Sequence, residues 1–257
     1  MESTEFKFPT EIIDLPSKGW FHPVEHPLAS GQIELYYMTA KHEDILTSKN
    51  LIQRGVVIDK LLEALIATNV PLSEDLLGDK AAIMIASRIL GYGKDYDVSL
   101  TCPECEAKNQ VVINLEDIEP KTSPYFVEEF KNRNEFPFYL PLTKKNITFK
   151  FLNHGDEMQI RSELDGIKKA TRSDIDREVT TRLRKIITSV EGEKNADKIR
   201  IFVDSLPARD ARVLREHLKD VTPDVDVSTN FTCSHCGYEG RVDIPIDVNF
   251  FWPNTRV

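Results

Sequence analysis

The sequence predicts an α+β fold in which strands and helices share the N-terminal half and a mostly helical insertion separates two matching hairpins. Short runs that alternate apolar and polar residues indicate strands, and apolar residues spaced three or four apart indicate amphipathic helices. A Thr-Cys-x-x-Cys motif with strand-like flanks occurs twice, at residues 101–105 and 232–236. Most of the remaining helical pattern lies between these two motifs.

The first 30 residues are expected to form an extended N-terminal arm. Prolines recur between Pro9 and Pro27. Proline breaks a helix interior and also disfavours the helical conformation of the residue before it. A helix is therefore not expected over residues 1–30, and the segment should run as an arm or as an edge strand.

Residues 31–118 are expected to form an α/β region that ends with the first cysteine hairpin. Residues 32–38 alternate in polarity, which indicates a strand, and Thr39 is placed to cap a helix that runs to Leu46. The spacing of apolar residues predicts two further helices, over residues 56–66 and 83–90. We expect Asp79 to cap the second of these helices.

Residues 119–224 are expected to form a β-hairpin followed by helices. Two runs rich in aromatic and β-branched residues flank a polar turn, which is typical of a hairpin over residues 136–142 and 147–152. Helical spacing of the apolar residues then predicts helices over residues 156–170, 174–190, 195–203 and 207–218.

Residues 225–257 are expected to form the second cysteine hairpin and a C-terminal tail. The tail contains three consecutive aromatic residues, Phe250, Phe251 and Trp252. Aromatic residues near a terminus either dock that terminus on the body of the protein or anchor a partner. Docking on the body is the preferred interpretation.

All four cysteines lie in the two hairpins, as Cys102, Cys105, Cys233 and Cys236. A structural zinc ion takes four soft ligands in a tetrahedron at about 2.3 Å, and each Cys-x-x-Cys turn can supply two. We therefore expect the four thiolates to bind one structural Zn²⁺ in a zinc ribbon. Here 127 residues separate Cys105 from Cys233, whereas such pairs are usually about 15–20 residues apart. Four protein ligands leave no open position, so the site would be structural.

Other interpretations of the cysteines remain open at this point. Each pair could form its own disulfide, each could be a redox dithiol, or the thiols could be unligated. A redox Cys-x-x-Cys is expected to open a helix after a strand, whereas strand-like runs follow both motifs, at residues 110–114 and 241–246.

Composition and charge limit the classes of function. The chain is 40% hydrophobic and 29% charged, so it can bury a core, and it has no run of about 18 apolar residues that would predict a membrane span. Residues 1–143 contain 13 Lys and Arg against 23 Asp and Glu, and residues 144–219 contain 18 against 13. An acidic body with a basic insertion favours a protein partner over nucleic acid.

The sequence contains no motif that predicts catalysis. It has no GxSxG, P-loop, GxGxxG or HExxH pattern. Its histidines do not cluster with a serine or cysteine nucleophile, except that His235 lies between two expected metal ligands. We therefore expect no catalytic and no cofactor-binding residues, and we predict that the protein is not an enzyme.

Several segments of the N-terminal half resemble one family. They are Leu15-Pro16-Ser17-Lys18-Gly19, His26-Pro27-Leu28, Gly31-Gln32-Ile33-Glu34 and Met38-Thr39-Ala40-Lys41-His42-Glu43-Asp44-Ile45-Leu46. Together they resemble the baseplate hub assembly proteins of T-even-like contractile-tailed bacteriophages, with the best match over residues 10–115. The resemblance implies a structural or assembly role at the central hub of the tail baseplate and implies no catalytic residues. The expected zinc comes from the cysteines and not from the resemblance.

The resemblance implies other phage baseplate hub or tail proteins as partners, with self-association left open. The resemblance also implies a location: the host cytoplasm during assembly, and the virion tail baseplate if the protein is retained there. A zinc-ribbon adaptor for a host protein or nucleic acid would need a basic face beside the hairpins, where Glu104, Glu106 and Glu239 lie instead. A cell-wall hydrolase would need an isolated acid pair in a cleft, which the sequence does not show.

Overall fold

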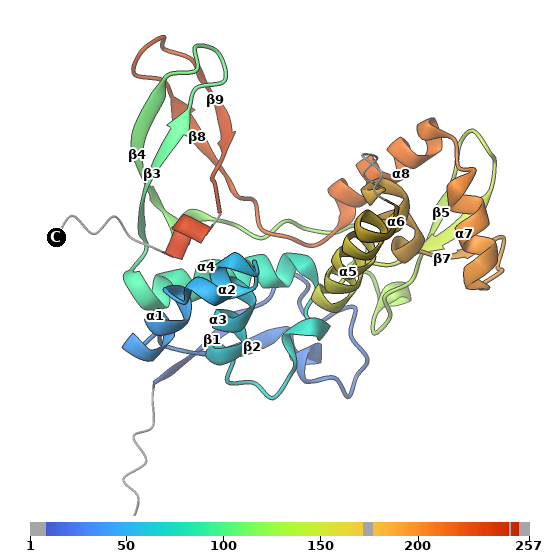
Figure 1. The fold of residues 1–257 in the computed structure, drawn as a ribbon, viewed down its shortest axis with the longest axis horizontal. Helices are drawn as coiled ribbons and strands as arrows, with labels where there is room; N and C mark the ends of the chain where they lie inside the picture. The colour runs from blue at the N-terminus through green and yellow to red at the C-terminus, as the bar shows by residue number, and fades with distance from the viewer. Residues whose placement is uncertain (1–8, 172–176, 247, 252–257) are drawn as a thin grey trace, which may run out of the picture.

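The computed structural model describes residues 9–171, 177–246 and 248–251, and it has three parts (Figure 1). A body of helices and a two-stranded sheet comes from the N-terminal third of the chain. A ribbon of two β-hairpins stands on this body, and an insertion of helices and a three-stranded sheet lies beside it. The protein therefore mixes helix and strand, as the α+β prediction requires.

The body packs its helices against the sheet formed by β1 and β2. These strands pair antiparallel, with Ile13 opposite Ile33. The predicted strand after residue 31 and the helix capped at Thr39 are confirmed, and the two further predicted helices are α3 and α4. The bounds are β1 Thr10–Asp14, β2 Gln32–Tyr36, α1 Ala40–Leu46, α2 Lys49–Gln53, α3 Val57–Leu65 and α4 Leu77–Tyr92.

The predicted cap of α4 is wrong. The helix begins at Leu77, and Leu76 occupies the N-cap position. Asp79 lies in the first turn, fully buried, where its Oδ1 accepts the N–H of Ser17 at 2.8 Å. The carboxylate therefore fastens the loop after β1 to the start of α4, which explains why an acidic residue occurs near this helix start.

The N-terminal segment differs from the expected extended arm. Only β1 is extended, and the chain then folds back so that Leu15, Phe21 and Leu28 are buried. Phe21 contacts the insertion, with its ring 5.3 Å from that of Phe136. The arm prediction is therefore wrong for residues 15–30, which join the body to the insertion. Residues 1–8 of the expected arm lie outside the described residues.

The insertion contains a three-stranded sheet in the order β5-β6-β7 and four described α-helices. The predicted hairpin is β5 with β6. The sequence predicts a helix that runs through Val190, and this predicted end is wrong. The helix α6 stops at Ile186, and the next four residues form β7 beside β6. The bounds are β5 Phe136–Tyr139, β6 Asn146–Phe149, α5 His154–Thr171, α6 Glu178–Ile186, β7 Ile187–Val190, α7 Ala196–Asp204 and α8 Ala208–Val221.

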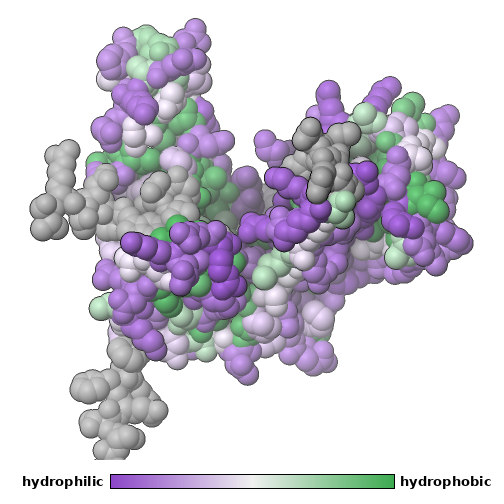
Figure 2. All heavy atoms as spheres, in the orientation of Figure 1, coloured by the Kyte–Doolittle hydropathy of each residue, from purple (hydrophilic) through white to green (hydrophobic). Residues whose placement is uncertain are grey.

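Ion pairs cover much of the surface of the insertion, as the interleaved charges of the sequence suggest. Arg182 forms two bonds of 2.8 Å to Glu157, and Arg212 pairs with Glu216 at 2.9 Å. Figure 2 shows mostly hydrophilic residues on the face of the insertion turned to the viewer. Beneath this surface lies an aromatic core, in which Phe136, Phe149 and Phe151 are fully buried.

The ribbon consists of two antiparallel hairpins that pack face to face on one apolar core. The bounds are β3 Asp95–Thr101, β4 Lys108–Asn114, β8 Ser228–Thr232 and β9 Glu239–Asp243. After β9, Phe250 and Phe251 are fully buried in the core that the body and ribbon share. Docking of these two aromatic residues is thus confirmed, whereas Trp252 lies outside the described residues.

The two connections to the insertion run side by side. Lys121 N–H donates to Asp224 O at 2.7 Å, and Asp226 N–H donates to Glu119 O at 2.8 Å. A Cβ on Gly78 would lie 1.9 Å from Pro223 O, so only glycine lets the returning chain pass over the start of α4. Among the described helices, none combines the length and apolar composition needed to cross a membrane.

A buried carboxyl group lies where the body meets the insertion. Asp75 is fully buried, and neither of its side-chain oxygens has a hydrogen-bond partner among the described residues. Its backbone oxygen accepts the N–H of His154 at 2.9 Å. Burial, with the nearby Asp79 and Glu74 carboxylates, raises the pKa of Asp75 to about 7. Because the folded chain binds this proton more tightly than the unfolded chain, stability should fall as pH rises from about 4 to about 7.

We predict that Asp75→Asn removes this loss. The variant should match the wild type near pH 4 and be more stable near pH 8, by about 1.4 kcal/mol for each unit of the pKa difference that is removed. Urea unfolding at both pH values measures the difference, with Asp97→Asn on the exposed face of β3 as the control. A variant that is equally or less stable than the wild type near pH 8 would show that Asp75 is not buried as a neutral acid.

Candidate metal centre

The two cysteine hairpins present their motifs at the same end of the ribbon. In β3, Tyr96, Val98 and Leu100 are buried against the second hairpin, whereas the residues between them face solvent. This alternation fixes which face of each hairpin turns inward. As a result, Cys102 and Cys233, the first cysteine of each motif, both point into the ribbon and are buried.

The two motifs form the same turn. Cys102 N–H donates to Ala107 O at 2.9 Å, and Cys233 N–H donates to Tyr238 O at 2.8 Å. Glu106 and Gly237 occupy matching positions with φ of 58° and 73°. Glycine adopts this left-handed conformation without strain, whereas glutamate does so at a cost. Because Glu106 adopts the conformation despite this cost, the repeated turn indicates that both motifs must place their sulfur atoms in the same way.

The structure brings all four predicted ligands together. The Sγ atoms of Cys102 and Cys236 are 3.7 Å apart, as are those of Cys105 and Cys233, and all four lie within 4.8 Å of one another. Ligands at 2.3 Å from one ion in a tetrahedron would be separated by about 3.8 Å. The spacing therefore fits four thiolates around a single tetrahedral metal ion.

The other interpretations of the cysteines fit the structure less well. The four thiols are free and not joined in disulfides. A strand follows each motif in place of the helix that a redox dithiol would open. In the described residues, the group of potential ligands contains these four sulfur atoms and not His235, whose side chain is exposed.

Backbone and side-chain donors lie beside the Cys233 sulfur atom. The N–H of His235 lies 3.4 Å from the Cys233 sulfur, and Asn109 Nδ2 lies 3.6 Å from it. The backbone N–H of Cys236 has the largest effect on Cys233 and, with that of His235, lowers the pKa of the thiol to about 6. Such donors stabilise the thiolate form that binds metals.

Asn109 was not identified from the sequence, yet it connects the two hairpins. It is buried at the start of β4, and its Oδ1 accepts the N–H of Ser234 at 2.8 Å and the Ser234 hydroxyl at 2.7 Å. Its Nδ2 also donates to Ala107 O at 3.0 Å within its own turn. A polar residue at an inward-facing position of an alternating strand, between exposed Lys108 and Gln110, is the signal that could have found it.

Comparison with known proteins identifies one family. The model of a family described as "T4 bacteriophage base plate protein" matches residues 21–252. The match includes both cysteine hairpins and the whole insertion, and so extends well beyond the segments of the N-terminal half that carry the sequence resemblance. The comparisons with curated proteins and with solved structures found no match.

We predict that Asn109→Ala weakens the ribbon. The substitution leaves the Ser234 N–H without its acceptor, which should cost about 1–3 kcal/mol of unfolding free energy and speed the loss of bound metal to a chelator. Asn230→Ala, on the exposed face of β8, is the control and should change neither quantity. Equal stability and equal metal release in the two variants would show that Asn109 does not brace the centre.

Proposed function

The chain belongs to the T4 bacteriophage base plate protein family, and from that premise we propose that it is a non-enzymatic structural or assembly component of the central hub of a phage tail baseplate. Membership itself indicates a structural or assembly role in the tail baseplate. The hub position is supported by the segments between residues 15 and 46 that resemble hub assembly proteins.

We also propose that Cys102, Cys105, Cys233 and Cys236 bind one structural Zn²⁺. The observation that carries this proposal is the convergence of four thiols, all within 4.8 Å, from hairpins far apart in sequence. Thiolates are soft ligands that select zinc over harder divalent ions, and four of them leave no position for water or substrate. Zinc bound here would supply a cross-link and no reactive group, which supports a non-enzymatic role.

Such a cross-link has a clear structural use in this fold. The ribbon consists of two separate two-stranded sheets, β3–β4 and β8–β9. A two-stranded hairpin is marginally stable in water, and metal binding that occurs only in the folded state adds its free energy to folding. The ribbon can therefore project from the body as a fixed shape although its core is small.

We propose other phage baseplate hub or tail proteins as partners, and self-association stays open. The protein would act in the host cytoplasm during assembly and remain in the virion tail baseplate if it is retained. Contact with nucleic acid is disfavoured because Arg182 and Arg212 of the insertion are committed to ion pairs. The exposed Glu104 and Glu106 beside the cysteines similarly disfavour a nucleic-acid adaptor.

The proposal predicts that the protein associates with baseplate hub intermediates and that Cys233→Ser reduces this association. Phage lacking the gene would be complemented with tagged wild type, with Cys233→Ser, or with the control Thr232→Ser on the exposed side of β8. Mass spectrometry of gradient-purified tail intermediates would then measure the tagged chain against other hub proteins. Absence of the wild-type chain from all tail intermediates would refute the assembly role, whereas undiminished association of Cys233→Ser would refute a need for zinc.

A further inference from the structure

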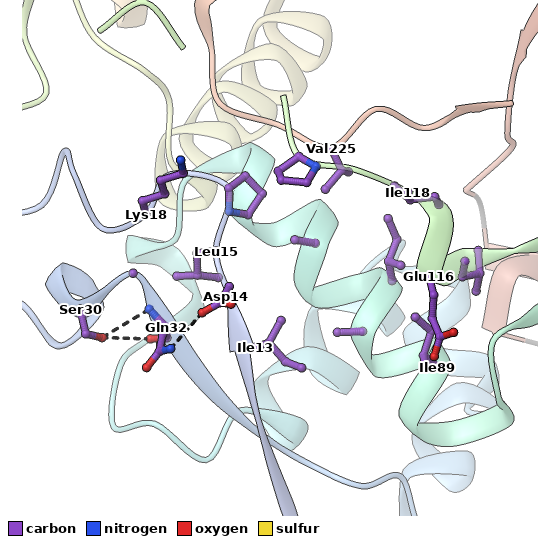
Figure 3. A pocket seen from close by; sticks show the side chains of 17 residues that line it. Ile13, Asp14, Leu15, Lys18, Ser30, Gln32, Ile89, Glu116, Ile118 and Val225 are labelled. Carbon is purple, nitrogen blue, oxygen red and sulfur yellow. Dashed lines mark hydrogen bonds between the residues drawn. The ribbon is translucent and has the colours of Figure 1, made fainter. Parts of the chain in front are cut away.

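An apolar groove lies between β1 and α4. It has a volume of about 660 Å³ and is lined largely by apolar side chains from β1, α4 and residues 115–120. Figure 3 shows Ile13 and Leu15 on one side of it and Ile89 and Ile118 on the other. On α4, Ala82 and Ala86 contribute short side chains that leave the floor of the groove open.

The strand that borders this groove has an unpaired edge. Leu15 N–H donates to Gly31 O at 2.8 Å, and Tyr37 N–H donates to Pro9 O at 3.2 Å. Because bonding alternates along an antiparallel pair, the residues at odd positions of β1 bond to β2. The N–H and C=O groups of Thr10, Ile12 and Asp14 therefore point away from β2, and in the described part of the chain they have no backbone partner.

The opposite edge of the same sheet is covered, which makes the open edge distinctive. Glu34 of β2 accepts the N–H of Ala67 at 2.8 Å, and its own N–H donates to Thr68 Oγ1 at 2.8 Å. Free edges of natural sheets are usually protected by charged residues, proline or a covering segment. Glu11 and Asp14 supply charges on the β1 edge, but at its middle lies Ile12, an apolar residue that is 62% exposed.

The charge around the groove selects the kind of partner. Asp14 lines it and Glu11 is exposed on the same strand, whereas Glu116, which also lines it, is paired with Lys94 at 2.9 Å. Among the described residues that line the groove, Lys18 is the one basic residue, and its ammonium group lies over the ring of Phe126, 5.2 Å from the centroid. The β1 side of the groove is therefore acidic through Glu11 and Asp14, and complementary charges at the ends of a bound segment would be basic.

We propose that the free edge of β1 and the adjacent groove bind an extended segment of another protein, with alternating apolar side chains and with lysine or arginine at its ends. Binding occurs by strand addition, in which the backbone of the segment pairs with Thr10, Ile12 and Asp14 while alternate side chains enter the groove. This inference rests on the assembly role proposed above, for which it supplies a contact surface.

A second copy of this chain fits the surface less well. Antiparallel pairing of β1 with itself about Ile12 would place Thr10 opposite Asp14 and Glu11 opposite Ile13, so acidic side chains of both copies would gather at one interface. Like charges that are close together across strands are destabilising. A basic-ended segment of another protein meets no such repulsion.

Hydrogen exchange of the full chain tests strand addition most specifically. The probe is a short synthetic peptide that alternates valine and threonine between lysine ends, and the control is the same peptide with glutamate ends. The lysine peptide should slow exchange at the amides of Ile12 and Asp14 and leave those of Glu11 and Ile13, which already bond to β2, unchanged. Equal binding of the two peptides, or protection without this alternation, would overturn the proposal.

Two variants distinguish the loss of the outward N–H group of Ile12 from a disruption of the fold. Ile12→Pro removes an outward N–H without removing a bond to β2, because proline is tolerated at such edge positions, and it should weaken binding of the lysine peptide about tenfold. Ile12→Val keeps the N–H and should bind as the wild type does. Unchanged affinity of Ile12→Pro, with hydrogen exchange showing β1 still paired to β2, would overturn the proposal.

The alternative occupants give different results. If Ile12→Pro converts a dimer to a monomer in sedimentation, a second copy occupies the edge and the proposal is overturned. If Phe6→Ser with Phe8→Ser in the full chain tightens peptide binding about tenfold, the chain's own N-terminus occupies it and the proposal is likewise overturned. Failure of peptide binding with continued association with tail intermediates would refute this surface and leave the assembly role intact.

Discussion

Four thiol groups from two distant hairpins meet in one cluster, and this constrains how the chain between the hairpins can run. Cys105 and Cys233 are separated by 127 residues, yet their sulfur atoms lie 3.7 Å apart. Closing such a loop costs about 2 kcal/mol more than closing the loop of a short zinc ribbon, because the entropic cost rises slowly with loop length. This cost is small beside the free energy of a structural zinc site, about 10–16 kcal/mol in small peptides. A long insertion is therefore compatible with a stable ribbon.

The fold reduces this cost further by the way it arranges the insertion. The outgoing and returning chains pair between Lys121 and Asp224, so the insertion begins and ends at one place. The insertion has its own aromatic core, whereas the ribbon shares a core with the body and with Phe250 and Phe251. The four cysteines thus close a loop whose ends the protein already holds together. The outgoing and returning connections also line the groove beside β1, through Ile118, Pro120 and Val225.

Local sequence patterns are sufficient to predict that the four cysteines meet, and to predict both hairpins and most helices. A Cys-x-x-Cys turn and an apolar periodicity each depend on residues that are close together in the sequence. Tertiary contacts were not predictable in the same way. Residues 187–190 form a strand because they pair with the edge of β6. The spacing of apolar residues in the preceding helix does not predict this pairing. The prolines excluded a helix before residue 30 but could not show that Phe21 packs on the insertion. Asn109 was missed because its partner, Ser234, is remote in sequence.

X-ray absorption at the zinc edge, made on protein purified without added metal, tests the central claim most directly. We expect one zinc per chain with four sulfur neighbours at about 2.3 Å. We also expect that the spectrum of Cys233→Ser, if any zinc remains, contains an oxygen or nitrogen neighbour in place of a sulfur. Protein without stoichiometric zinc, or a wild-type spectrum with oxygen or nitrogen ligands, would contradict the assignment of the four cysteines as a closed structural site.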